Sequence, residues 1–513
     1  MSERFLSFSR LSSSRLSFSR LSFIALLLGP PLAALVLILA ASARAISPGG
    51  LRVGLLLITG FHLLIFALLF AGSESSGESS YPGESSSPGE RSPLAEDRRS
   101  PPAFLPLFFL FLQCFLAGAG FYFSDDALRH IYDGNLLLQG ADVYRTAPRE
   151  LGAFAGILPN HPELPTIYLP FTQLQAIAGA LVSPRFGFLF IFHFLSGMTA
   201  LAVYYFLRPK ERAAWLFFLF SPYFLLVSSS HHADVQGFLF IALVLVGTRF
   251  LREQILAGRF GREELRTCFL LGFFTGLPIG LKPEGGAWAL FFLFAFAFIV
   301  RLPEKKARLA FYSGFFAALA ILGGTAFFIL FPDLESLRSL GNTIRVFTGS
   351  FVAYNPFLVL LPRILDRPLE EIIGPYQGAV LFLAAGGLLF LGLRLTGWKN
   401  SSSSADAGGR TSRPALALLW ALASFLFFRG VWHPWYFLWL LPALLLLGKT
   451  RLLLGLVVCL PLFYLPVIEL RASGVWDFNG FYFVFCGYFL LWILLTGKPM
   501  AGLIQIWSKK RAV

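Results

Sequence analysis

Long apolar runs alternate with short polar segments along most of the chain. A membrane-spanning helix needs about 20 apolar residues to cross about 30 Å of hydrocarbon, so each run is a candidate span, and the shorter runs must borrow flanking residues. The pattern predicts an all-α polytopic membrane protein with a bundle of about 12–14 transmembrane helices. The predicted spans are Phe23–Ala41, Val53–Ala71, Phe104–Phe123, Phe186–Leu207, Ala213–Val227, Val235–Phe250, Cys268–Leu281, Ala287–Val300, Leu309–Phe331, Tyr376–Leu395, Pro414–Phe428, Tyr436–Leu447, Leu452–Ile468 and Phe481–Leu495.

Changes in composition divide the chain into four parts. Residues 1–72 form a basic N-terminal segment and a two-helix membrane extension. Residues 73–102 are rich in Ser, Gly, Glu and Pro and bury too little apolar surface to fold, which predicts a disordered linker. Residues 103–497 contain the remaining spans and form the predicted working module. Residues 498–513 form a basic tail, which we expect in the cytoplasm.

Composition supports a membrane protein and excludes a nucleic-acid-binding one. Hydrophobic residues make up 56% of the chain and charged residues 14%, whereas soluble domains carry roughly 25% charged residues. The net charge of +14 comes from Lys and Arg in short loops, as expected of cytoplasmic loops, and no basic stripe interleaved with aromatics lies in a polar segment. The four cysteines lie in apolar runs without metal-binding spacing and are predicted core residues.

The basic loops also predict the orientation of the helices. Placing them in the cytoplasm gives a consistent alternation through most of the chain. The run Leu169–Val182 does not fit this alternation, and we interpret it as a partial or interfacial helix. The segments predicted to lie outside are 124–165, the turns 228–234 and 281–286, the loop 332–375, and the turn 429–436.

Two adjacent acids open the first outer segment. Asp125 and Asp126 follow an apolar span directly, and neighbouring carboxylates at a low-dielectric boundary repel, which keeps one of them basic enough to accept a proton. The structural alternative is a helix start at which the acids favour the helix dipole. On that helix Arg129 would share their face, either in an internal ion pair or holding one carboxylate in position.

Two later outer turns add polar side chains. His231, His232 and Asp234 precede a span closely, where they either cap it and form hydrogen bonds or, with a third well-placed ligand, bind a metal ion. Lys282 and Glu284 lie in the next outer turn. The Lys282 side chain either snorkels to the surface or contacts an anionic group such as a lipid phosphate.

The last outer turn combines cations with aromatic rings. Arg429 and His433 are costly at a membrane edge unless they have a partner. The adjacent Trp435 and Tyr436 either belong to an interfacial aromatic belt or provide a stacking surface for a sugar.

The first outer segment resembles the first extracytoplasmic loop of the GT-C glycosyltransferases, in the bacterial branch similar to polyprenyl-phosphate-mannose-dependent mannosyltransferases. The similarity lies in the order Asp125-Asp126, Arg129, Tyr132, Asp133-Gly134, Gly140, Tyr144 and Pro148, followed by NHPELPTIYLPFTQ at 160–173. HHADVQGF and HPWY also resemble motifs of this superfamily, and the resemblance covers roughly Phe104–Leu495. It implies a GT-C-type bundle whose catalytic first outer loop supplies an acidic base, here Asp125 or Asp126. The predicted substrate-binding residues are Arg129, Asp133, Tyr144, His231, His232, Asp234, Lys282, Glu284, Arg429, His433, Trp435 and Tyr436.

These features together predict an integral membrane glycosyltransferase, specifically a mannosyltransferase-like hexosyltransferase. It would move a sugar from a polyprenyl-phosphate donor to an extracytoplasmic glycan or lipid acceptor with inversion, in the cell (inner) membrane with its active site outside. No cofactor is required, although the acidic pair has the ligands to accommodate a divalent metal ion. The alternatives are a transporter or flippase of a lipid-linked saccharide and a non-catalytic scaffold. We favour the enzyme because the unusual polar residues gather at outer helix ends and no repeated half is visible.

Overall fold

A computed structural model describes the parts of the chain used below. These are residues 33–34, 36–38, 47–48, 50–60, 104–116, 124–282, 304–350, 366, 386, 433–446, 455, 457–474, 484 and 487–488. This part is mostly helical and contains no strand, only one isolated bridge between Phe154 and Ile157. The linker 73–102 and the predicted spans Ala287–Val300 and Pro414–Phe428 lie outside the described residues, as do the predicted site residues Glu284 and Arg429.

Three of the described helices are long and apolar enough to cross a membrane: Gly187–Phe206, Ala233–Ile255 and Lys305–Leu330. They confirm the predicted helical, membrane-compatible character of the chain, while the total of about 12–14 spans stays a prediction. The helix Ala233–Leu256 extends beyond the predicted run Val235–Phe250 at both ends, whereas Gly187–Phe206 lies within the predicted run Phe186–Leu207. The third span begins at Lys305, before the predicted Leu309, and changes from α-helix to π-helix at Ala326.

The chain divides into two compact units. The first comprises Met1–Ser100, Ala213–Leu226 and Leu454–Val513. Within it, Arg52 in the helix Gly50–Gly60 forms an ion pair with Glu469 of α22. The Tyr488 hydroxyl donates to the carbonyl of Leu56 at 3.1 Å. The N-terminal extension is therefore bound to the C-terminal part of the chain.

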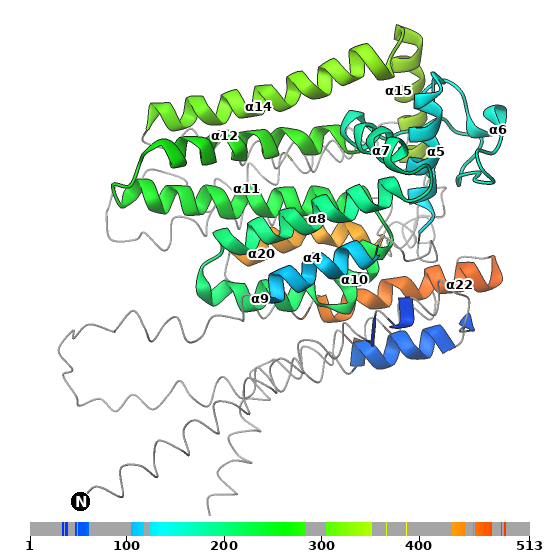
Figure 1. The fold of residues 1–513 in the computed structure, drawn as a ribbon. Helices are drawn as coiled ribbons and strands as arrows, with labels where there is room; N and C mark the ends of the chain where they lie inside the picture. Colours follow the sequence, from blue (N-terminus) through cyan, green and yellow to red (C-terminus); the bar gives the residue numbers. More distant parts are fainter. Residues whose placement is uncertain are drawn as a thin grey trace, which may run out of the picture. The chain divides into compact units, whose positions relative to one another are not determined.

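The second unit comprises Pro101–Arg212 and Val227–Leu453. In it, α8, α11, α12 and α14 run alongside one another (Figure 1). Helices α12 and α14 approach so closely that a Cβ atom on Gly272 would lie 1.9 Å from the carbonyl oxygen of Phe311, and one on Gly314 would lie 1.9 Å from that of Phe269. Glycine at both positions is therefore required for this packing.

Shorter elements occupy one end of these helices. Tyr132 and Leu136 of α5 form a core there with Tyr144, Leu330 and Leu340, the last from α15. The bounds of the helices are α4 Phe104–Leu116, α5 Asp126–Leu138, α6 Pro148–Leu151, α7 Pro170–Val182, α8 Gly187–Phe206, α9 Pro209–Leu219, α10 Pro222–Ser229, α11 Ala233–Leu256, α12 Arg262–Gly276, η1 Leu277–Gly280, α14 Lys305–Thr325, η2 Ala326–Leu330, α15 Leu334–Ser350, η4 Pro434–Leu440, α20 Leu441–Leu446, η5 Leu460–Tyr464 and α22 Leu465–Ser473.

Three segments differ in detail from their prediction. The run Ala213–Val227 is not one helix, because α9 ends at Leu219 and Pro222, which lacks a backbone N–H, starts α10. The loop 332–375 contains α15, an amphipathic helix that a search for apolar runs does not detect. Helix α7 has 13 residues, about 20 Å at 1.5 Å per residue, which is too short to cross the bilayer alone and suits a partial or interfacial helix.

Candidate functional site

The acidic pair lies at the start of α5, at the end of the bundle formed by the second unit. Asp126 is the first residue of α5, and its backbone N–H donates to the Ser124 hydroxyl at 3.2 Å. The side-chain amide of Asn160 donates to both carboxylates, at 2.9 Å to Asp125 Oδ1 and 3.0 Å to Asp126 Oδ1. A single amide nitrogen with two hydrogens thus bridges two like charges and holds them side by side.

The second oxygen of Asp126 receives further donors. The Tyr168 hydroxyl donates to Asp126 Oδ2 at 3.2 Å, and His232 Nε2 lies 2.6 Å from the same oxygen. Burial alone would raise the pKa of Asp126, but the His232 charge and hydrogen bond, with Lys282 and Asn160, outweigh it and hold the pKa well below its ordinary value. Asp126 is therefore a stable anion and a weak base.

His232 connects two carboxylates. Its Nδ1 atom lies 2.6 Å from Asp234 Oδ2, while its Nε2 atom contacts Asp126. Burial and the Lys282 charge would lower the pKa of His232, but Asp126 and the hydrogen bonds to Asp126 and Asp234 raise it above the ordinary value. Because both ring nitrogens face acceptors, the imidazolium, which carries two N–H donors, is the form that satisfies both contacts.

Lys282 completes a row of alternating charges. Its Nζ atom lies 3.7 Å from Asp234 Oδ2 and donates to the Tyr436 hydroxyl at 3.5 Å. It also lies 5.4 Å from the centre of the Tyr436 ring, which is cation–π geometry. The sequence Asp126, His232, Asp234, Lys282, which we call the charge row, therefore alternates negative and positive groups from one side chain to the next.

Aromatic rings from η4 cover the histidine. The Trp435 ring stacks on His232 with centroids 4.0 Å apart and on His433 at 4.5 Å. Trp435 and Tyr436 are buried, so their rings support the charge row from the protein side. The predicted stacking of a sugar on these rings is not tested by this arrangement.

The guanidinium of Arg129 forms hydrogen bonds to the backbone of the first outer segment. Its Nη2 atom donates to the backbone carbonyls of Asn160, His161 and Leu164, at 3.2, 3.0 and 2.9 Å. The arginine thus fixes the segment that carries Asn160, and Asn160 in turn holds both acids.

Three further predicted residues, Asp133, Tyr144 and His231, lie outside the charge row. Asp133 accepts a hydrogen bond from the Gln173 amide at 3.1 Å, and burial raises the pKa of its carboxyl. The Tyr144 hydroxyl donates to the Tyr168 carbonyl at 2.5 Å. His231, at φ +54, packs against His193 with ring centroids 5.0 Å apart, away from the charge row. These three residues support the loop and the helices around the acids.

Several residues of the site carried no individual prediction. Asn160 and Tyr168 lie in the segment 160–173, which was part of the resemblance. Neither residue type indicates from the sequence that its side chain would donate to an acid of the site. His130 packs its ring edge-on against Tyr168, with centroids 4.1 Å apart, and burial lowers the pKa of His130 to about 3. His130 is therefore a neutral ring beside the acids at physiological pH.

The described residues contain no preformed metal site. They contain no cluster of three or more His, Cys, Asp or Glu side chains with metal-binding geometry. Of the triplet His231, His232 and Asp234 that the sequence offered as metal ligands, His232 has both ring nitrogens within 2.6 Å of carboxylate oxygens. In this arrangement the imidazole acts as a hydrogen-bond donor to two acids.

No family model matches the chain, and no curated protein or solved structure matches it. What the fold defines is a mostly helical chain whose three long apolar helices are compatible with membrane association. The particular activity therefore has to be inferred from the residues of this site.

Proposed function

We propose that the chain is a multi-pass membrane glycosyltransferase, similar to mannosyltransferases, which transfers a sugar from a polyprenyl-phosphate donor to a glycan or lipid acceptor outside the cytoplasm. The observation that supports this most is the acidic pair beside the charge row at one end of the spanning helices. At that end, an acidic side chain that would deprotonate the acceptor hydroxyl is close to cations that would bind a lipid phosphate. The resemblance of the first outer segment to the GT-C loop points to the same chemistry.

Asp125 is the base in this proposal. Asp126 takes hydrogen bonds from Asn160 and Tyr168 and pairs with His232, and a carboxylate held in this way has little affinity for another proton. Asp126 therefore anchors the site, and Asp125 accepts the proton of the acceptor hydroxyl.

The proposed reaction is a single displacement. As Asp125 takes the proton, the acceptor oxygen forms a bond to the anomeric carbon from the face opposite the phosphate. The bond between that carbon and the phosphate oxygen breaks, the polyprenyl phosphate leaves with the electron pair, and the anomeric configuration inverts. Lys282 and the imidazolium of His232 supply positive charge for the departing phosphate.

Substitution of the two acids tests this proposal. Membranes containing Asp125→Asn should transfer radiolabelled mannose from a polyprenyl-phosphate donor about 100-fold or more slowly, because a positioned general base contributes about that much. Asp126→Asn should also be impaired, since it loses the partner of His232. Glu150→Gln, an exposed acid of the same loop, is the matched control and should transfer normally. Full transfer in both aspartate variants would disprove the proposal.

The transporter alternative has one observation in its favour. Polar side chains are buried within or beside the spanning helices, where they often mark a substrate path. However, these groups bond to one another, as Gln236 of α11 does to Gln175 of α7 at 2.9 and 2.7 Å, and His193 of α8 does to Gln113 of α4 at 3.0 Å. This mutual pairing favours helix packing over transport. Uptake of a fluorescent polyprenyl-phosphate sugar into sealed vesicles without any transfer would favour the alternative.

A further inference from the structure

Helix α15 lies across the end of the bundle instead of along it. In Figure 1 it runs crosswise to the spanning helix α14, which it follows in the chain. Three residues, Phe331, Pro332 and Asp333, separate α15 from the end of that span at Leu330. Because α14 and η2 together form a candidate membrane span, the start of α15 must lie close to the level at which the chain leaves the bilayer.

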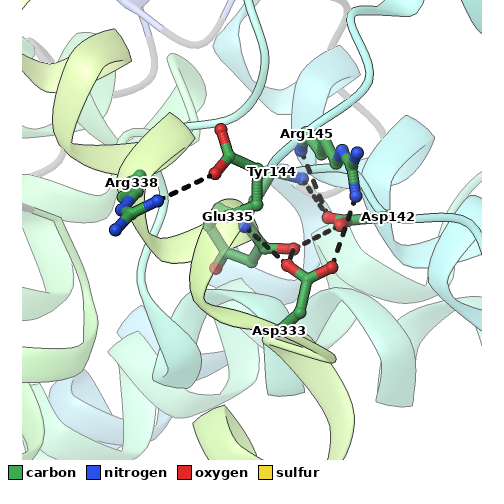
Figure 2. Close-up of polar contacts among 7 residues, drawn as sticks. Asp142, Tyr144, Arg145, Asp333, Glu335 and Arg338 are labelled. Carbon is green, nitrogen blue, oxygen red and sulfur yellow. Dashed lines mark hydrogen bonds and ion pairs between the residues drawn. The ribbon is translucent and has the colours of Figure 1, made fainter.

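One face of α15 is fixed to the protein. Leu340 and the partly buried Ile344 pack into the core formed with Tyr144 and Leu330. Polar contacts secure the N-terminal end, where the Ser336 hydroxyl donates to Asp142 at 2.5 Å and Arg145 lies 3.3 Å from Asp333 (Figure 2). These contacts determine which face of α15 packs against the protein and which face is exposed.

An exposed apolar edge borders the packed face of α15, and a cationic stripe follows it around the helix. Leu334 and Leu337 are 74% and 51% exposed. This edge continues the exposed apolar surface at the end of the span, where Phe328 is 82% exposed. Arg338, which pairs with the exposed Glu335 at 3.4 Å (Figure 2), and Arg345 follow next around the helix, at about 100° per residue. Asn342 lies beyond them on the polar side.

We infer that α15 is an interfacial helix that binds the bilayer on the side of the candidate site. Leu334 and Leu337 insert at the boundary between headgroups and acyl chains, and the adjacent arginines contact phospholipid phosphates. Helices with an apolar edge flanked by cations bind membranes in this way, with the apolar side buried about 5–10 Å below the headgroups. A bilayer is the occupant that fits, because the exposed edge is continuous with the lipid-facing surface of a span.

This inference is independent of the proposed glycosyl transfer, but it has a consequence for the site. The ring of Phe347 on α15 meets the ring of His161 edge-on, with centroids 5.5 Å apart. His161 follows Asn160, which holds the acidic pair. A helix bound to the bilayer would therefore fix the loop, and with it the acids, at a defined height above the membrane.

Spin labels on the two edges of α15 test the inference. The full-length protein, with Cys114, Cys268, Cys459 and Cys486 replaced by alanine, is reconstituted in vesicles of phosphatidylcholine and phosphatidylglycerol. Single cysteines then carry a nitroxide at Leu337 (Leu337→Cys), at Asn342 (Asn342→Cys) as the matched control on the same helix, and at Phe328 (Phe328→Cys) as the lipid reference. Collision rates with oxygen, which concentrates in lipid, are compared with those of a water-soluble nickel complex.

We expect the label at position 337 to resemble the lipid reference, with oxygen collisions dominating, and the label at 342 to report mainly nickel collisions. Equal, mainly aqueous readings at 337 and 342 would overturn the inference. Spectral broadening at 337 that disappears on dilution with unlabelled protein would also overturn it, because a second copy of the chain would then cover this edge. Neither reading requires a sugar donor, so failure here and failure of the proposed function are distinguishable.

Discussion

The two ends of α11 both carry charged side chains, but in different arrangements. At the C-terminal end, Arg249 donates to both carboxylate oxygens of Glu211, at 2.8 and 2.5 Å, and Arg208 pairs with Glu253. At the N-terminal end, His232 lies between two carboxylates, one of which also faces Lys282.

The two arrangements suit different roles, one structural and one chemical. At the C-terminal end each arginine is matched by one glutamate in a direct hydrogen-bonded pair, an arrangement that suits a structural role. The charge row contains a histidine held between two carboxylates, whose pKa is raised above the ordinary value by Asp126 and by the hydrogen bonds to Asp126 and Asp234, and it lies beside a second, directly adjacent acid. Under the proposed function, the charged side chains at one end of the helix take part in chemistry, and those at the other end join helices.

After Asp125→Asn, the largest effect is expected for His232→Gln. Glutamine carries no charge and has one amide in place of two ring N–H donors, so Asp126 loses its imidazolium partner. Transfer should fall about 100-fold, a typical loss for a group that controls acid–base chemistry. His193→Gln, which changes another buried histidine of the same unit, is the control, and radiolabelled sugar transfer is the measurement. Equal losses in the two variants would contradict a special role for the charge row.

The pH dependence should have an alkaline limit set by His232. Because the pKa of His232 is raised in the folded protein, the stability it contributes is fully present below the ordinary histidine value and is lost as pH rises through the raised pKa. The pKa of Asp126 is lowered, so its contribution is present above the ordinary carboxyl value and is lost as pH falls through the lowered pKa. The intact charge row exists between these two limits.

Asp234→Asn should move the alkaline limit. Without the carboxylate of Asp234, His232 loses a hydrogen bond that raises its pKa, so the pKa of His232 should fall and the alkaline limb of the pH–rate profile should shift to lower pH. Glu253→Gln at the opposite end of α11 is the control and should leave the limb in place. An unchanged limb in Asp234→Asn would show that another group limits transfer at high pH.

A smaller effect is expected for Tyr436→Phe. The substitution removes the hydroxyl that accepts from Lys282 at 3.5 Å but keeps the ring beneath the ammonium. One long hydrogen bond contributes about 0.5–1.5 kcal/mol, so transfer should fall only a few-fold, whereas Tyr205→Phe, an exposed tyrosine of α8, should have no effect. A loss as large as that of His232→Gln would mean that the phenol takes part in the reaction itself.

The smallest effect on transfer is expected at the other end of α11. Arg249→Met alone removes both guanidinium hydrogen bonds of Glu211 and should lower the free energy of unfolding by up to about 3–5 kcal/mol, while replacing both residues by methionine should restore most of it. Transfer by the double variant should stay within about twofold of the unsubstituted protein, because the pair is far from the site along α11. Thermal unfolding in detergent and transfer are measured together. A stable but inactive double variant would break the distinction between the two ends.

The spanning helices were predictable because their signal is local. Apolar runs marked the three long spans, and the amphipathic α15 was missed because its apolar residues recur at helical spacing and form no run. The break before Pro222 was available from the sequence through the missing N–H of proline. The arrangement of the helices depends on contacts such as that between Gly272 and Phe311, for which the sequence has no marker.

The charged members of the site were predictable, and the contacts between them were not. Asp126, His232, Asp234 and Lys282 stood out as polar residues at the ends of apolar runs, and the fold brings them together from three separate turns. Arg129 stood out through its spacing from the acids, but its partners are backbone carbonyls more than 30 residues away. Such contacts leave no trace in residue type.

The three carbonyl contacts of Arg129 predict how the first outer loop can vary among related sequences. Main-chain oxygens are present whatever the side chain, so positions 161, 163 and 164 can change without loss of the contact. The number of residues between Asn160 and Leu164 cannot change, because an insertion or deletion would move the carbonyls out of reach of a single guanidinium. This loop should therefore tolerate substitutions readily while its length stays fixed.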